Sequence, residues 1–108
     1  MQLPETTERL SHSSNTWFVR GKKTFVMYLD NHHGDGRLAI WCAAPIGFQA
    51  VIVEADPVHF FVPPYVGYRG WIGYRLDRGL DLEEVADLVE QAYRQIAPKT
   101  LVARLDAD

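Results

Sequence analysis

The chain has 108 residues, of which 47% are hydrophobic and 12% aromatic, and a formal net charge of -3. This length and composition exclude a disordered chain and predict one globular domain over residues 1–108. The single cysteine excludes an internal disulfide. Because no apolar run resembles a signal peptide or is long enough to cross a membrane, we expect a cytoplasmic protein. The net negative charge argues against a dedicated nucleic-acid binder without excluding one.

The first fifteen residues are polar, and they precede a predicted hairpin. LPETTERL predicts a short helical turn with Pro4 at its first position, and SHSSN predicts a loop. TWFVR and TFVMYLD are predicted strands. Residues 20–23 join them, and Gly21 at the first central position predicts a tight type II′ turn.

The stretch DNHHGDG, residues 30–36, leads from the second strand into a third, RLAIWCAA. Its asparagine, aspartate and glycine residues tolerate left-handed backbone angles and predict a hairpin loop. A metal site would need several side chains converging on one point, whereas the neighbours His32 and His33 point apart in an extended chain. We therefore favour a solvated loop over a metal site, and we expect no cofactor. Cys42, in the third strand, is predicted to be a buried, unreactive thiol.

The middle of the chain predicts a helix followed by two short strands. PIGFQAVIVEA predicts a helix that packs through Phe48, Val51, Ile52 and Ala55, with Gln49 and Glu54 facing outward. Two prolines confine a strand at residues 60–62 to an edge or an end of the sheet. Residues 67–70 predict a turn, and WIGYRLD predicts a further strand.

A C-terminal helix is the clearest predicted element. Asp81 can cap its first turn, with Glu84 completing a pattern like a capping box. Its apolar stripe consists of Leu82, Val85, Leu88, Val89, Ala92, Tyr93 and Ile96. Pro98 ends the helix, and KTLVARLDAD is a short extra turn or a tail. Together the elements predict an α+β domain, a mostly antiparallel sheet with helices packed on one face.

Four motifs carry a resemblance to a known family, in which they occur in the same order along the chain: LPETTERLSH, TWFVRGKKTFVMYL, ADPVHFFVPPYVGYRGWIGYRLD and DLEEVADLVEQAYRQIAPKTL. In these the chain resembles the MmcQ/YjbR family from about Leu3 to Leu101. The resemblance implies a CyaY-like α+β fold and DNA binding through the tips of β-hairpins. The family usually has a full helix before the LPET segment, which here is short or absent. We therefore expect either a shorter N-terminus or coverage by another chain.

The first functional hypothesis is DNA binding through two basic turns. Arg20, Lys22 and Lys23 lie in the first predicted turn, and Arg69 lies in a later one. Cations that project from turns can reach phosphates, so weak and non-specific binding is expected. Lysines at a turn are, however, more often simply solvated, and from the sequence alone that interpretation is favoured.

The second hypothesis is a protein-interaction or self-associating module. Alternation along the predicted strands suggests that Tyr28 and Trp41 lie on the sheet face away from the helices. An exposed aromatic face would mark an interface, most simply that of a homodimer. Coverage of both faces within the monomer is equally compatible with the pattern.

The third hypothesis is an enzyme. His12, His32, His33 and His59 are candidate bases, with Asp30, Asp35, Asp56 and Asp77 as partners. None has the spacing of a known catalytic motif, and His59 follows a predicted helix end, where a packed histidine is ordinary. The sequence therefore predicts a non-catalytic binding module with DNA as its candidate partner, and a protein partner or self-association as the alternative.

Overall fold

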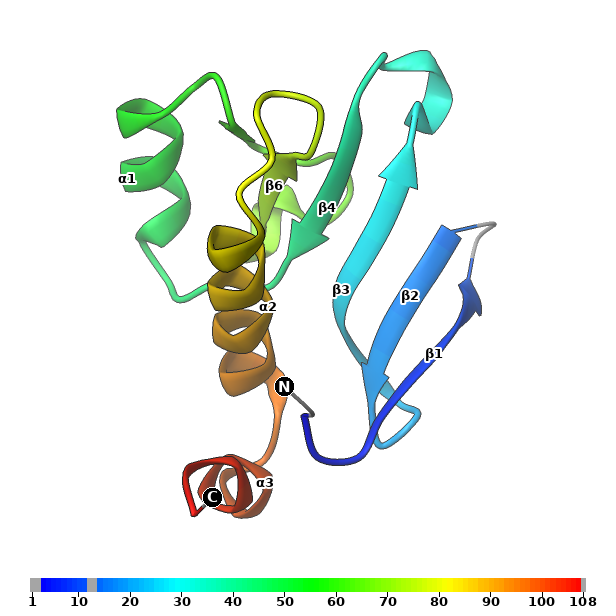
Figure 1. The fold of residues 1–108 in the computed structure, drawn as a ribbon, viewed down its shortest axis with the longest axis vertical. Coiled ribbons are helices and arrows are strands. Elements are labelled where there is room, and N and C mark those ends of the chain that lie inside the picture. Colours follow the sequence, from blue (N-terminus) through cyan, green and yellow to red (C-terminus); the bar gives the residue numbers. More distant parts are fainter. Residues whose placement is uncertain (1–2, 12–13, 108) are drawn as a thin grey trace.

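Within residues 3–11 and 14–107, which the computed structural model describes, six strands form one antiparallel sheet with three α-helices beside it (Figure 1). The sheet order is β1-β2-β3-β4-β6-β5. The strands are β1 (Thr6–Ser11), β2 (Ser14–Val19), β3 (Lys23–Asp30), β4 (Leu38–Cys42), β5 (Phe60–Phe61) and β6 (Ile72–Arg75). The α-helices are α1 (Phe48–Ala55), α2 (Leu82–Ile96) and α3 (Lys99–Asp106), and two 3-10 turns are η1 (His32–Gly34) and η2 (Gly67–Arg69). The predicted α+β class is confirmed.

The prediction of a helical turn in LPETTERL is wrong, because these residues lead into an edge strand. Strand β1 pairs with β2 along its whole length, from Thr6 opposite Val19 to Ser11 opposite Ser14. Pairing with a neighbouring strand satisfies the backbone groups of this polar segment and outweighs its weak local helix preference. Of the predicted SHSSN loop, Ser14 and Asn15 already belong to β2, and residues 12 and 13 lie outside the described residues.

The turn between β2 and β3 is tight, but its type differs from the prediction. Both central residues have positive φ, 54° at Arg20 and 66° at Gly21, and the Lys22 N–H donates to the Val19 carbonyl at 3.1 Å. Positive φ at both positions is the pattern of a type I′ turn, whose twist matches that of the flanking strands better than most other turns. The turn is therefore centred one residue earlier than predicted.

Helix α2 covers one face of the sheet, as the amphipathic pattern predicts (Figure 1). Its buried residues are Leu88, Ala92 and Tyr93. The Tyr93 ring meets the edge of Phe25 with centroids 5.7 Å apart, and its hydroxyl donates to the Pro4 carbonyl at 2.8 Å. The Asp81 carboxylate accepts the backbone N–H groups of Glu83 and Glu84, which confirms the predicted cap. Leu82 is 73% exposed and does not belong to the packed stripe, because it lies in the first turn, at the end of the contact with the sheet.

Helix α1 forms where predicted, and Phe48 and Ile52 pack against the core as expected, but the rest of its packed face differs from the prediction. Val51 is 65% exposed and Ala55 is exposed, whereas Gln49 turns inward. The Gln49 amide donates to the carbonyls of Gly67 and Trp71, at 2.9 and 2.6 Å. These bonds satisfy loop carbonyls, which explains why a polar residue takes a packed position.

The face of the sheet turned away from α2 is covered partly by the chain itself. The register places Trp41 opposite Met27, and Tyr28 opposite Ile40, so Trp41 and Tyr28 lie on opposite faces. Trp41 is 2% exposed, and the His32 ring lies edge-on against it with centroids 5.0 Å apart. The Tyr65 ring packs against His32 in turn, at 6.0 Å. The predicted exposed aromatic face of Tyr28 and Trp41 is therefore wrong.

The remaining predictions concern short elements and the C-terminus. Strand β5 lies at the edge of the sheet, as the two prolines after it predict, and β6 is its neighbour. KTLVARLDAD contains the two-turn helix α3, in which Leu101 is buried. No helix in the described part of the chain combines the length and apolarity needed to cross a membrane.

Candidate functional site

Three of the four predicted DNA-contacting residues line one hollow. Arg20, Lys22 and Lys23, from the β2–β3 turn, border a space of about 260 Å³. Its other lining residues are Val19, Ile96 and Pro98. Figure 1 shows the turn and the junction between α2 and α3 at the same end of the molecule. We call this site, defined by its six lining residues, the basic hollow.

Arg20 is held in place by the segment before β1. Its backbone N–H donates to the Glu5 carbonyl at 2.8 Å, and its Nε atom donates to Glu5 Oε1 at 3.1 Å. Glu5 Oε2 accepts a second guanidinium, that of Arg104 in α3, at 3.0 Å. One carboxylate is thus shared by two arginines, which leaves an excess of positive charge at this end of the molecule.

The backbone at Arg20 is in a conformation that arginine rarely adopts. Its φ of 54° lies in the left-handed region, which costs roughly 1–2 kcal/mol for a residue with a Cβ atom. Asparagine or glycine would take this position at lower cost. The two hydrogen bonds to Glu5 offset part of this backbone cost. They also hold the Arg20 guanidinium at the hollow that Lys22 and Lys23 border. Strain of this kind is typical of functional positions.

Lys22 and Lys23 are exposed, and neither makes an ion pair with a carboxylate of the described residues. A fourth cation supports the turn from the edge strand: Arg9 Nη1 donates to the Gly21 carbonyl at 3.1 Å. The Arg9 guanidinium also lies over the Phe18 ring, 3.7 Å from its centroid. Two lysines are therefore available to an anion, beside two arginines that already have partners within the chain.

Arg69 does not join the basic hollow. It lies in η2, and its guanidinium is 5.9 Å from the centroid of the Trp71 ring. Strands β3 and β6 both run antiparallel to β4, so the β2–β3 turn and η2 precede their strands at the same end of the sheet. Because β4 lies between β3 and β6, the axes of these two strands are roughly 10 Å apart. The structure therefore places the two predicted turns at one end without bringing their cations together.

The histidine pair in DNHHGDG lies in a hairpin turn, as predicted, but it is not fully solvated. The rings of His32 and His33 pack edge-on with centroids 4.1 Å apart. Burial is the main cause that lowers the pKa of His32, and its Nε2 atom is buried without a hydrogen-bond partner among the described residues. Within residues 3–11 and 14–107, no group of three or more His, Cys, Asp or Glu side chains is arranged to hold a metal ion.

Among the described residues, Asp30, Asp35 and Asp77 do not converge on a histidine to form a shared site. His12 lies outside the described residues. Asp30 and Asp35 are exposed at the β3–β4 turn, where Asp35 accepts the Arg37 backbone N–H. Asp77 accepts the Arg75 guanidinium at 3.0 Å. Cys42 is fully buried, as predicted, and burial raises the pKa of its thiol to about 12.

His59 is a packed histidine that is held on both sides of its ring. Nδ1 lies 3.0 Å from Asp56 Oδ2, and Nε2 lies 2.5 Å from the Arg78 carbonyl oxygen. The ring also stacks on Tyr74 with centroids 5.9 Å apart. Because both ring nitrogens face acceptors, the protonated form is favoured, and the bond to Asp56 is the main cause that raises the pKa of His59.

This arrangement predicts stability that depends on pH. Because the folded-state pKa of His59 lies above its ordinary value of 6.5, the contribution is complete below pH 6.5 and is lost as pH rises through the folded-state pKa. Its partner Asp56 has a lowered pKa, so the pair is weakened again as pH falls below the ordinary aspartate value of 3.8. The Tm difference between wild type and His59→Gln should therefore be larger near about pH 5.5 than near about pH 9.

Thermal melting followed by circular dichroism measures this difference, and Asp56→Asn serves as the matched variant on the other side of the pair. The two variants should lose the same pH dependence, because each removes one member of a single interaction. A Tm difference that does not change with pH would contradict the assignment of a charged His59.

Sequence reasoning missed the residues that support the basic hollow. Glu5 and Arg9 were expected in a helical turn, and Arg104 was expected in a short extra turn or a tail. Strand pairing and helix α3 instead bring all three to the β2–β3 turn region. A signal was present in the β-branched pair before ERL, since Thr6 and Thr7 favour a strand.

The sequence was compared with known protein families and with curated proteins. The family model described as YjbR matches residues 1–95. No curated protein matches the chain in sequence. The match spans the whole sheet and nearly all of α2, so the basic turn lies inside the family domain.

Proposed function

The chain belongs to the YjbR family, and on that premise we propose that it is a non-catalytic module that binds DNA through the phosphate backbone at the basic hollow. The observation that carries this proposal is the convergence of Arg20, Lys22 and Lys23 on one hollow. No carboxylate belongs to its described lining, and Glu5 holds Arg20 from outside it. Clustered cations attract phosphates, and hairpin turns project far enough to reach them.

The binding is weak and independent of sequence. Contacts to phosphate position a protein on DNA but do not read its bases. The basic turn offers lysine and arginine side chains, which are suited to phosphate contacts. Three cations predict a slope of about -3 for the logarithm of the binding constant against the logarithm of salt concentration.

The test measures binding to a short DNA duplex by fluorescence anisotropy at several salt concentrations between about 50 and about 200 mM. Wild type should bind with the slope given above. The variant Lys22→Gln, Lys23→Gln removes two of the three cations, so its slope should fall to about -1 and its affinity at low salt should fall as well.

Arg78→Glu is the matched control, because it changes the net charge by the same two units at the opposite end of the sheet. Arg78 follows β6, whose far end lies away from the β2–β3 turn. The control should bind like wild type. Equal losses in both variants would mean that overall charge, rather than the basic hollow, governs binding, and no binding of wild type at low salt would remove the proposal.

A protein-interaction or self-associating surface is the second candidate function. The segment between β5 and β6 exposes large apolar and aromatic side chains: Val62 is 53% exposed, Tyr65 71% and Tyr68 87%. Aromatic residues of this kind are enriched at protein interfaces. Light scattering at rising protein concentration separates the two candidates, since a dimer that dissociates in Tyr68→Ser would favour the second.

A further inference from the structure

A second hollow lies between α2 and the segment that joins β4 to α1. Its volume is about 330 Å³, at the lower end of the range of small-molecule sites. Its lining residues are Ala43, Ala44, Pro45, Phe48, Ile72, Glu84, Asp87, Leu88 and Gln91. We call this second hollow the α1–α2 cleft.

The small residues after β4 explain why the cleft exists. Ala43 and Ala44 are buried, and their small side chains line the cleft opposite α2 residues such as Leu88. Pro45 and Gly47 then turn the chain into α1, which packs against the domain without burying any residue completely. The space between the two helices is left to Phe48, Ile72 and Leu88, so its floor is apolar.

The rim of the cleft is acidic. Glu84 and Asp87 are three residues apart on α2 and lie on neighbouring turns, whereas the described lining contains no Lys or Arg. Neither carboxylate makes an ion pair with a cation of the described residues, in contrast to Glu90 on the same helix, which pairs with Arg94 at 3.4 Å. Glu84 acts on His59 only through its charge, as one of the smaller causes that raise the pKa of that imidazole.

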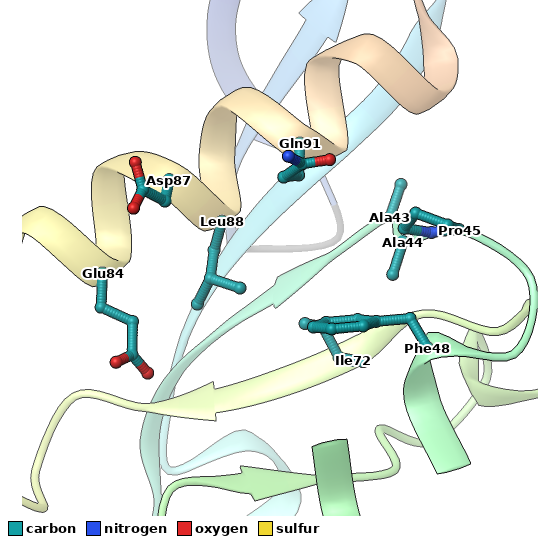
Figure 2. A pocket seen from close by; sticks show the side chains of 9 residues that line it. All are labelled: Ala43, Ala44, Pro45, Phe48, Ile72, Glu84, Asp87, Leu88 and Gln91. Carbon is teal, nitrogen blue, oxygen red and sulfur yellow. The ribbon is translucent and has the colours of Figure 1, made fainter. Parts of the chain in front are cut away.

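Figure 2 shows how these groups are oriented. Glu84 and Leu88 extend from α2 toward the strands, and the ring of Phe48 turns one face toward the helix across the cleft. The Asp87 carboxylate does not extend toward the strands in this view. A flat apolar body can therefore lie between Phe48 and Leu88 while a cationic group reaches Glu84.

We propose that the α1–α2 cleft binds a small organic cation, a primary amine with an aromatic or short aliphatic body. The ammonium group donates to Glu84, and the body contacts the Phe48 ring, Ile72 and Leu88. Charge complementarity favours a cation over an anion, and the apolar floor favours an amine with a hydrocarbon body over an inorganic cation. This site is separate from the basic hollow, and its occupant has the opposite charge.

The test is a titration of the isotope-labelled full chain with 2-phenylethylammonium, followed by two-dimensional NMR. The expected result is a saturable shift of the backbone amides in residues 43–48 and 84–91. The neutral analogue 2-phenylethanol and the anion 3-phenylpropanoate should bind at least about tenfold more weakly, because they lack the charge-assisted bond to Glu84.

Glu84→Gln should weaken binding of the amine by about tenfold while leaving binding of the alcohol unchanged. Glu83→Gln is the matched control, since Glu83 lies on the same helix turn but does not line the cleft. N-acetyl-phenylalanyl-lysinamide, which carries an ammonium and a ring on a peptide, should bind more weakly than the free amine. Tighter binding of that peptide, equal binding of amine and alcohol, or shifts that do not saturate would each overturn the proposal.

Discussion

Tyr93→Ala is expected to lower the free energy of unfolding by about 3–5 kcal/mol, the cost of removing a large buried aromatic side chain. Tyr93 is completely buried and connects three parts of the chain. It lies on α2, its ring meets Phe25 of β3, and its hydroxyl donates to Pro4 ahead of the edge strand. Loss of the ring therefore leaves a cavity where α2 meets the sheet. Urea denaturation followed by circular dichroism measures the change.

Tyr93→Phe separates packing from hydrogen bonding. The ring remains, and only the bond to the Pro4 carbonyl is lost, so the expected cost is about 1 kcal/mol. If the two substitutions had equal effects, the packing of the ring against Phe25 would contribute little, and the assignment of α2 as the main cover of the sheet would be wrong.

Trp41→Ala is expected to destabilise the fold by a similar amount, about 3–5 kcal/mol. Trp41 is the largest of the fully buried side chains on the face turned away from α2. Its ring supports His32 in η1, which in turn contacts Tyr65, so the substitution should loosen both covering segments. Chemical denaturation measures the loss in the free energy of unfolding, and amide hydrogen exchange in residues 30–36 measures the loosening of the turn that contains η1.

Trp41→Phe is the informative control for this position. The indole Nε1 atom is buried and has no hydrogen-bond partner among the described residues, so replacing indole by phenyl breaks no hydrogen bond. The cost should therefore be well below that of alanine and should reflect only the lost volume. A Trp41→Phe variant as unstable as Trp41→Ala would contradict this account of the indole.

The elements predicted correctly are those whose signals are local. Helix α2 follows from a cap at Asp81 and an apolar stripe, and both act within the helix itself. The hairpin of β2 and β3 follows from two apolar runs with a glycine between them. The β3–β4 turn likewise follows from residues that accept left-handed angles, such as Asn31 with φ 53°.

The errors occur where distant parts of the chain determine the structure. LPETTERL leads into β1 because β2 offers an unpaired edge, whereas the strand preference of Thr6 and Thr7 is only a weak signal within the segment itself. Gln49 turns inward because two loop carbonyls more than fifteen residues away need a donor. Trp41 and Tyr28 were placed on one face because the relative register of β3 and β4 could not be derived from alternation alone.

The candidate site shows the same division. The cations Lys22 and Lys23 could be identified from the sequence because a turn exposes them. The hollow that they border could not, because Ile96 and Pro98 reach it only through the packing of α2. The bond from Arg104 to Glu5 joins residues that are 99 positions apart, and no local pattern predicts it.

The most direct test of the central claim is an NMR titration of the labelled chain with a short DNA duplex at about 50 mM salt, where phosphate contacts are strongest. We predict that the shifted amides will cluster in residues 19–23 and 96–99, and that the shifts will diminish as salt is added. Shifts confined to the segment between β5 and β6 or to the α1–α2 cleft, or no shifts at all, would contradict the claim that DNA binds at the basic hollow.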